Sequence, residues 1–170
     1  MAVNEIRDRI SHALEELYQT DAVLFIKNDG NGVAERCLAF RLAHYLQLNF
    51  PDYSVDCDYN SSYVEGRSES GKMIRMPHGQ QVKRYIDIII HRRNHNQNSD
   101  FLCFEIKKWN NKTSKGMGKD RNNLDILTSE YGYRKGFHII LGKTLSETTL
   151  EIFNHDTDRT QLNWDEFNNE

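Results

Sequence analysis

The sequence lacks any apolar run long enough to cross a lipid bilayer, and its first residues lack the apolar core of a secretory signal. With 28% of residues charged, these absences predict a cytoplasmic protein that makes no contact with a membrane. Cysteine is scarce: Cys37, Cys57 and Cys103 are odd in number and widely spaced in apolar surroundings. This pattern predicts free thiols and argues against a disulfide framework or a zinc ribbon.

The chain has neither internal repeats nor low-complexity segments, and 170 residues can bury one hydrophobic core. We expect a single domain over residues 1–170, with a core at about 33–141, an N-terminal helix within 1–27 and a C-terminal extension at 146–170. Periodicity predicts the order α-α-β-β-β-α-β plus a tail, which is an α/β fold around a short mixed sheet. The polar stretches 60–81 and 110–119 are expected to be loops, and Asp120 is expected to cap the third helix.

Two apolar runs within residues 82–109 each contain a carboxylate, and turn-forming residues separate them. Asp87 interrupts the first run and Glu105 the second. Because the two positions are symmetric about Asn96, a hairpin centred there would place their Cβ atoms about 5 Å apart. Lys107 follows Glu105 by two residues and therefore lies on the same strand face. The pattern predicts two acids and a lysine around a metal ion, because like charges this close repel without a cation.

Net charge is only −3, but positive charge is concentrated around this hairpin. Residues 72–121 contain twelve Lys or Arg against four Asp or Glu, whereas the rest of the chain contains ten against twenty-one. A basic surface on an otherwise acidic protein is typical of polyanion binding, although a solvated basic face is the simpler alternative. The residues expected to contact nucleic acid are Lys72, Arg75, Lys83, Arg84, Arg92, Lys108, Lys112, Lys115 and Lys119.

The chemistry of these residues suits phosphodiester hydrolysis. Carboxylates are typical Mg²⁺ ligands, so Asp87 and Glu105 are expected to bind the ion with the backbone carbonyl of Ile106. Lys107 would orient the attacking water and stabilise the transition state. The alternative is a buried ion pair without catalytic function, which would contribute little stability. Glu35, in the first turn of the second helix, either complements the helix dipole or reaches the metal.

These residues resemble the PD-(D/E)xK nuclease superfamily, which includes restriction endonucleases and Holliday-junction resolvases. The likeness extends over about 33–141 and rests on VDCDYN (55–60), YIDIIIHRR (85–93) and FEIKKW (104–109), which look like small, largely uncharacterised bacterial and mobile-element members. Ile86 stands where the family name has proline. The resemblance implies a restriction-endonuclease-like α/β/α fold, a catalytic role for Glu35, and Mg²⁺ with Mn²⁺ as a substitute. Asp58 and His91 would be expected beside the ligands.

We therefore expect a Mg²⁺-dependent endodeoxyribonuclease that binds DNA, with RNA left open as a substrate. A homodimer is expected if both strands of a duplex are cut. One alternative is a non-catalytic nucleic-acid-binding or regulatory protein that keeps the nuclease fold. Another is a dimeric junction-resolving endonuclease in recombination.

Overall fold

The protein is described from a computed structural model. The backbone is described for residues 1–26, 32–59, 62–64, 67–69, 73–75, 81–83, 85–92, 100–154 and 159–169. Side chains are described for the same residues except those in 62–83 and at positions 100 and 169. The predicted centre of the hairpin turn, Asn96, therefore lies outside the described residues.

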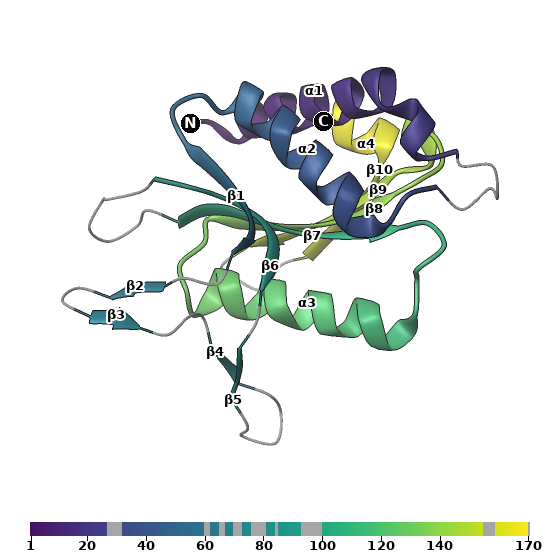
Figure 1. Ribbon diagram of the computed structural model, residues 1–170. Coiled ribbons are helices and arrows are strands. Elements are labelled where there is room, and N and C mark those ends of the chain that lie inside the picture. The colour runs from purple at the N-terminus through teal and green to yellow at the C-terminus, as the bar shows by residue number, and fades with distance from the viewer. Residues whose placement is uncertain are drawn as a thin grey trace.

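Six strands form one mixed sheet, and helices cover both of its faces (Figure 1). The order across the sheet is β1-β6-β7-β8-β9-β10, in which β7 and β8 are parallel and the other neighbours are antiparallel. The bounds are β1 (Ser54–Tyr59), β6 (Ile86–His91), β7 (Asp100–Lys108), β8 (Lys135–Leu141), β9 (Thr149–Asn154) and β10 (Arg159–Asn163). The prediction of an α/β fold around a mixed sheet is confirmed, and the restriction-endonuclease-like arrangement stays a prediction.

One face of the sheet is covered by α1 (Val3–Thr20), α2 (Glu35–Asn49) and the short α4 (Trp164–Asn169) (Figure 1). In α1, Ile6, Ile10, Leu14 and Leu17 recur at helical spacing and are fully buried. Burying such side chains is favourable by about 1.5–3 kcal/mol each, so this stripe fixes the helix against the core. The 3₁₀ helix η1 (Ala22–Leu24) follows α1.

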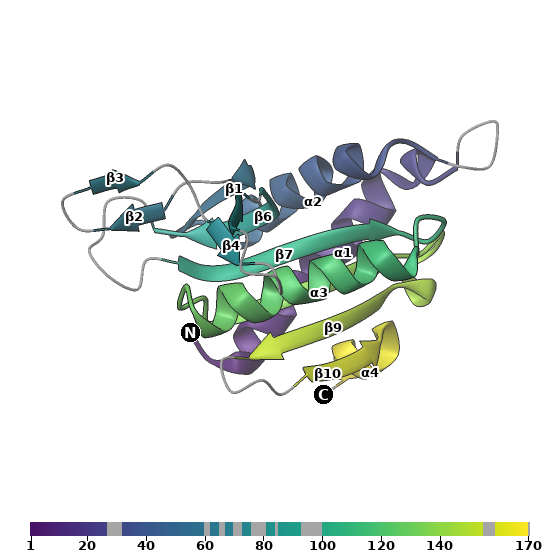
Figure 2. The same cartoon turned by 90° about the horizontal axis from the view of Figure 1, so that it is seen from below.

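The opposite face is covered by α3 (Ser114–Ser129), which runs along the sheet between β7 and β9 when seen from below (Figure 2). The predicted loop is therefore confirmed for 110–113 and wrong for 114–119, and the predicted cap at Asp120 is wrong. The N-cap is Thr113, whose hydroxyl accepts a hydrogen bond from the backbone N–H of Gly116. A Cβ at Gly116 would lie 2.8 Å from that hydroxyl, so glycine at this position suits the cap and does not break the helix.

The C-terminal extension belongs to the sheet and the core. Beyond the 3₁₀ helix η2 (Leu145–Glu147), β9 and β10 form an antiparallel pair at the sheet edge. Trp164 and Phe167 of α4 are buried with the α1 stripe, as expected of residues that anchor a polar tail. The chain after residue 146 therefore completes the fold.

The predicted loop at 60–81 contains short strands that form two separate ribbons beside the main sheet (Figure 2). Their bounds are β2 (Ser62–Val64), β3 (Arg67–Glu69), β4 (Met73–Arg75) and β5 (Gln81–Lys83). β2 pairs with β3 and β4 pairs with β5, both antiparallel. The loop prediction is therefore wrong for these strands, which are too short for periodicity to reveal.

The three cysteines are free thiols, as predicted: Cys103 is buried, and Cys37 and Cys57 are partly buried. Within the described part of the chain, none of the helices is both long enough and apolar enough to cross a bilayer.

Candidate active site

Asp87 and Glu105 lie on adjacent antiparallel strands and face α3. β6 and β7 pair with Ile88 opposite Phe104 and Ile89 opposite Cys103, which is the register predicted from symmetry about Asn96. Ile89 and Cys103 pack against α3, so alternation along each strand also directs Asp87 and Glu105 to that face. The side-by-side placement of the two acids thus follows from the strand register.

The two carboxyl groups sit in an environment that disfavours their charge. Glu105 is only 4% exposed, and its burial, with the nearby charges of Asp87 and Asp120, raises its pKa well above the usual range. Burial also raises the pKa of Asp87, although the backbone N–H of Ile106 and the ammonium of Lys107 oppose the shift. The pair therefore holds a proton more tightly than two solvated carboxyl groups would. A bound cation would offset the same burial and charge repulsion.

Backbone and amide donors fix the orientation of the two acids. The N–H of Ile106 donates to Oδ2 of Asp87 at 2.8 Å, and Nδ2 of Asn123 donates to Oε1 of Glu105 at 3.0 Å. Asn123 comes from α3 and is buried, so the helix holds one acid while the strand holds the other. The structure shows the N–H of Ile106 in contact with the site; a role for its carbonyl oxygen stays a prediction.

Lys107 extends from the same strand face into a pair of carboxylates. Its Nζ lies 3.1 Å from Oε1 of Glu35 and 3.0 Å from Oδ2 of Asp120. Desolvation lowers the pKa of Lys107, but the two facing carboxylates outweigh it, so the net pKa is raised. Lys107 therefore stays protonated at neutral pH. It would present a positive charge and hydrogen-bond donors to a phosphate.

Glu35 makes three contacts that a helix-dipole acid would not need. Besides Lys107, its carboxylate accepts hydrogen bonds from the backbone N–H of Lys108 at 2.9 Å and from Nδ2 of Asn111 at 3.1 Å. The first turn of α2 is thus tied to the end of β7. Glu35 therefore contacts Lys107 of the candidate site in addition to standing in the first turn of α2, and a contact of Glu35 with a metal ion stays a prediction.

The sequence did not indicate Asp120, Asn123 or His138, and all three line this cluster. Asp120 and Asn123 are buried on α3. With the helix start placed correctly, positions 120, 123, 124 and 127 follow the spacing of a buried helical stripe, which is the signal that could have found them. His138 pairs with Glu105 in the register of β7 and β8, so strand pairing would have indicated it.

His138 is 1% exposed and lies near two carboxylates of the cluster. Its Nε2 is 3.8 Å from Oδ2 of Asp120 and its Nδ1 is 3.6 Å from Oε2 of Glu151, both too long for hydrogen bonds. Burial lowers the pKa of His138 despite these two acids. Glu151 is in turn paired with Arg121 at 2.7 Å, so a row of polar groups extends from Lys107 across β8 to β9.

His91 shares the strand face of Asp87, but its described ion pair is with β1. The pairing of β6 with β1 is regular through His91, which opposes Ser54. The register shift beside His91 skips a residue on β7 and leaves the alternation of β6 intact. Nε2 of His91 pairs with Oδ2 of Asp56 at 2.7 Å. His91 is four residues from Asp87, which is about 13 Å along a strand, so a contact of His91 with the acid pair stays a prediction.

Asp58 has a positive φ of 49°, which breaks the alternation of β1. Cys57 packs with the core beneath α2, whereas Tyr59 packs with the cluster beneath α3, so the two side chains lie on opposite faces of the sheet. The carboxylate of Asp58 is bound by the guanidinium of Arg36 on α2. Asp58 is thus a partner of α2 and does not contact the acid pair through any interaction described for it.

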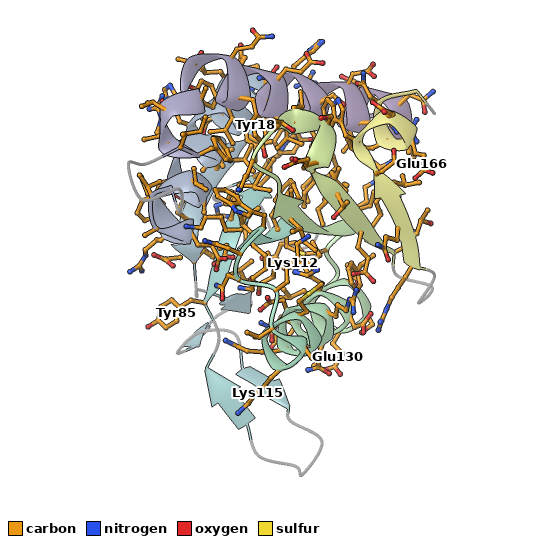
Figure 3. All side chains as sticks on the ribbon, turned by 90° about the vertical axis from the view of Figure 1, so that its right-hand side faces the viewer. Tyr18, Tyr85, Lys112, Lys115, Glu130 and Glu166 are labelled. Atoms are coloured by element: carbon orange, nitrogen blue, oxygen red, sulfur yellow. The ribbon has the colours of Figure 1, made fainter. Side chains whose placement is uncertain are left out.

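The predicted DNA-contacting residues fall into three groups. The side chains of Lys72, Arg75, Lys83 and Arg84 lie outside the described residues. Lys108 is buried and its Nζ donates to the backbone carbonyl of Val33, which argues against direct contact with DNA. Arg92 is exposed and stacks on Tyr53, while Lys112, Lys115 and Lys119 are exposed around the start of α3, with Lys115 pointing away from the core (Figure 3).

Solvent reaches the cluster from the end of the sheet where α2 and α3 begin. The side chains of Glu35 and Lys107 are 25% and 14% exposed, and Asp87 is partly exposed, while Glu105 is nearly closed off. The three exposed lysines around the start of α3 flank this opening.

Comparisons with known proteins leave the family open. No protein-family profile matches the chain, and no curated protein matches it. A solved structure described as "Crystal structure of SSO0001" aligns with 93% of this chain and 65% of its own length, at 14% identity and a TM-score of 0.38. The chain thus spans less than two thirds of that protein, and a likeness this weak carries no argument about fold or function.

Proposed function

We propose that this protein is a metal-dependent nuclease of the PD-(D/E)xK kind, hydrolysing phosphodiester bonds in DNA. The observation that carries the proposal is the meeting of Asp87, Glu105 and Lys107 at one end of two adjacent strands, with Glu35 joined to Lys107. Buried charge clusters contribute little to stability and are costly to desolvate. Their presence beside an opening to solvent is typical of a site that has a function.

The residues present fit a divalent metal ion. Asp87 and Glu105 supply oxygen ligands, and burial raises the pKa of both, so a bound cation would stabilise their charged forms. Among the described residues, no three His, Cys, Asp or Glu side chains are grouped to hold a metal by themselves. Mg²⁺ suits such a site because it is commonly held by one or two carboxylates, with water and substrate phosphate completing its shell.

The chain's own groups have separate tasks in the proposed reaction. A bound Mg²⁺ would neutralise charge on the phosphate and lower the pKa of water beside it. Asp87, held by the N–H of Ile106, and Glu105, held by Asn123, fix where the ion sits. Lys107 donates hydrogen bonds to the phosphate and stabilises negative charge that develops as the water oxygen bonds to phosphorus and the P–O bond to the leaving group breaks.

The exposed lysines support a polyanion as substrate. Lys112, Lys115 and Lys119 surround the start of α3, close to the opening beside Lys107. Neutralising backbone phosphates with lysine releases counterions and supplies most non-specific affinity for DNA. Lys112, Lys115 and Lys119 would therefore hold the backbone near Lys107 without selecting a sequence.

The burial of Glu105 favours a second candidate, a non-catalytic nucleic-acid-binding protein that keeps the same fold. A ligand that is 4% exposed must be uncovered for a metal to reach it. In this case the lysines would still bind DNA, but no phosphodiester would be cut. The two candidates differ in one measurable property, which is cleavage.

Cleavage of plasmid and of a four-way junction in Mg²⁺ or Mn²⁺ tests the proposal. We expect the wild-type protein to cut, and Asp87→Asn and Lys107→Met to lower the rate at least about 100-fold. Asp125→Asn and Lys143→Met remove charges at exposed or partly exposed sites elsewhere and should not change it. Binding without cleavage in all variants would establish the non-catalytic candidate. Preference for the junction over duplex would indicate a resolving enzyme.

A further inference from the structure

Asp120 is a buried acid in the interior of α3, where neither the helix nor the core needs one. It is 3% exposed, and its neighbours on the buried stripe, Leu124 and Leu127, are apolar. Aspartate is a poor former of helix interiors, and burying its charge is costly without a partner. Its presence calls for an interaction that offsets both costs.

That interaction is with Lys107. Oδ2 of Asp120 lies 3.0 Å from Nζ of Lys107, although the angles do not meet those of a directed hydrogen bond. Oε1 of Glu35 lies 3.1 Å from the same Nζ. The ammonium is therefore paired with one carboxylate from α2 and one from α3.

The position of this ammonium matters because Lys107 is half-buried on a flexible four-carbon chain. With Glu35 alone, the side chain could swing toward solvent at the open end of the sheet, where Glu35 is itself 25% exposed. Asp120 is 3% exposed, so its carboxylate holds the ammonium from the interior of the protein. His138 is also buried, and its Nε2 lies 3.8 Å from the same Oδ2 of Asp120, which restricts movement of that carboxylate.

We propose that Asp120 is a positioning residue that holds the ammonium of Lys107 in place beside Asp87 and Glu105. The inference rests on the proposed nuclease function and adds one residue to it. Asp120 acts through Lys107 and touches neither metal nor phosphate. Its removal should therefore lower kcat and leave both substrate affinity and protein folding in place.

The stability of the variant separates this role from a structural one. A structural ion pair loses stability when one partner is removed. Here Asp120 is itself buried in one cluster of acids with Asp87 and Glu105, and like charges gathered away from water repel each other. Asp120→Asn removes that repulsion while Glu35 still pairs with Lys107, so the melting temperature should be unchanged or higher. A positioning residue that is selected for activity at the expense of stability behaves in this way.

The test compares Asp120→Asn with Asp125→Asn, which lies on the same helix and pairs with Arg159 at the surface. Steady-state cleavage of a DNA duplex in Mg²⁺ gives kcat and KM. A ¹H–¹⁵N spectrum of the lysine ammonium groups, with the Lys107 peak identified by its loss in Lys107→Met, reports directly on whether the ammonium is held. The spectrum needs no activity.

For Asp120→Asn we expect kcat to fall about 10- to 100-fold with KM within about two-fold, and the Lys107 peak to broaden or disappear. Asp125→Asn should leave kcat and the peak as in the wild type. Wild-type kcat with an intact peak in Asp120→Asn would overturn the proposal, as would a lower melting temperature with kcat unchanged. If Asp120→Asn does not fold, Asp120→Glu, which keeps the charge but displaces it, should shift the peak and lower kcat.

A wild-type protein that cuts no substrate would refute the nuclease function, and the ammonium spectrum would then decide alone whether Asp120 holds Lys107. If the protein cuts no substrate but the Lys107 peak is lost in Asp120→Asn, Asp120 still holds the ammonium of Lys107, although no reaction is catalysed. If the peak is kept in Asp120→Asn, both the nuclease function and the role of Asp120 are refuted. The two failures are thus distinguishable.

Discussion

Glu35 and Lys107 connect the helix layers around one end of the sheet: Oε1 of Glu35, in the first turn of α2, lies 3.1 Å from Nζ of Lys107 on β7. The same carboxylate accepts the backbone N–H of Lys108. A first-turn acid that only complements the helix dipole would point to solvent and contribute a few tenths of a kcal/mol to about 1 kcal/mol. The contacts of Glu35 instead place its carboxylate where it can fix the position of the Lys107 ammonium.

Glu35→Gln should therefore slow DNA cleavage about 10- to 100-fold, because the neutral amide no longer fixes the ammonium of Lys107. The rate is measured at saturating Mg²⁺. The matched control is Glu5→Gln, a first-turn acid of α1 that pairs with Arg9 at the surface. Equal, small losses of stability in both variants with full activity would show that Glu35 acts on the helix dipole alone.

The sheet at the site could be predicted because its register follows from the sequence. A hairpin centred on Asn96 makes the two apolar runs antiparallel strands and fixes which residues oppose each other. The observed pairing of Ile88 with Phe104 agrees with this register. The alternation of β6 is regular through His91, so the sequence could place His91 on the face of Asp87. The sequence could not reveal the positive φ of Asp58, after which Tyr59 packs on the opposite side of the sheet from Cys57. Alternation is reliable only up to the first such irregularity.

The α3 side of the site was missed for a different reason. Gly116 and Gly118 in the first turns of α3 suggest a loop, but the Thr113 cap and burial of Leu124 and Leu127 outweigh their cost of about 1 kcal/mol each. With the helix start misplaced, Asp120 was predicted to be a cap and its buried position was not seen. Tertiary packing makes these residues helical, and the helix propensities of the residues alone do not predict it.

Glu105→Gln should stabilise the protein, and increasingly so as pH rises. Because burial and two nearby acids raise the pKa of Glu105, the folded state binds a proton that the unfolded state releases. The stability associated with this proton is complete below the unfolded pKa and is lost as pH rises through the folded pKa, by up to about 1.4 kcal/mol per pH unit. Gln carries no charge, and it can still accept the hydrogen bond from Asn123.

Thermal unfolding of the wild type and Glu105→Gln between pH 5 and pH 9 checks this. The difference in melting temperature should be small at pH 5 and grow in favour of the variant toward pH 9. Glu130→Gln, an exposed acid at the end of α3, should show no such trend. A difference that shrinks with rising pH would mean that Glu105 is stabilised as a carboxylate in the folded protein.

The thiol of Cys57 should react slowly with alkylating reagents even though it is only partly buried. Desolvation, with the charges of Asp58, Asp56 and Asp87, raises its pKa to about 11. Because the thiolate is the reacting form, alkylation by iodoacetamide at pH 8 should be about 100-fold slower than in the unfolded chain. Peptide mass spectrometry after timed labelling, with and without urea, gives both rates. Equal rates would show that Cys57 is solvated and that the acids around it are screened.

DNA binding by the lysines around the start of α3 should appear in its salt dependence. Lys115 and Lys119 are exposed on the first turns of α3, beside the opening to Lys107. If each neutralises one phosphate, Lys115→Gln and Lys119→Gln should each make the slope of log Kd against log salt shallower by about 1, because fewer counterions are released.

Arg7→Gln removes one charge from α1, on the other face of the sheet, and should leave the slope unchanged. Fluorescence anisotropy with a labelled duplex measures the slope. An identical slope in all four proteins would mean that DNA, if bound, lies elsewhere, and the proposed path of the backbone past Lys107 would be wrong.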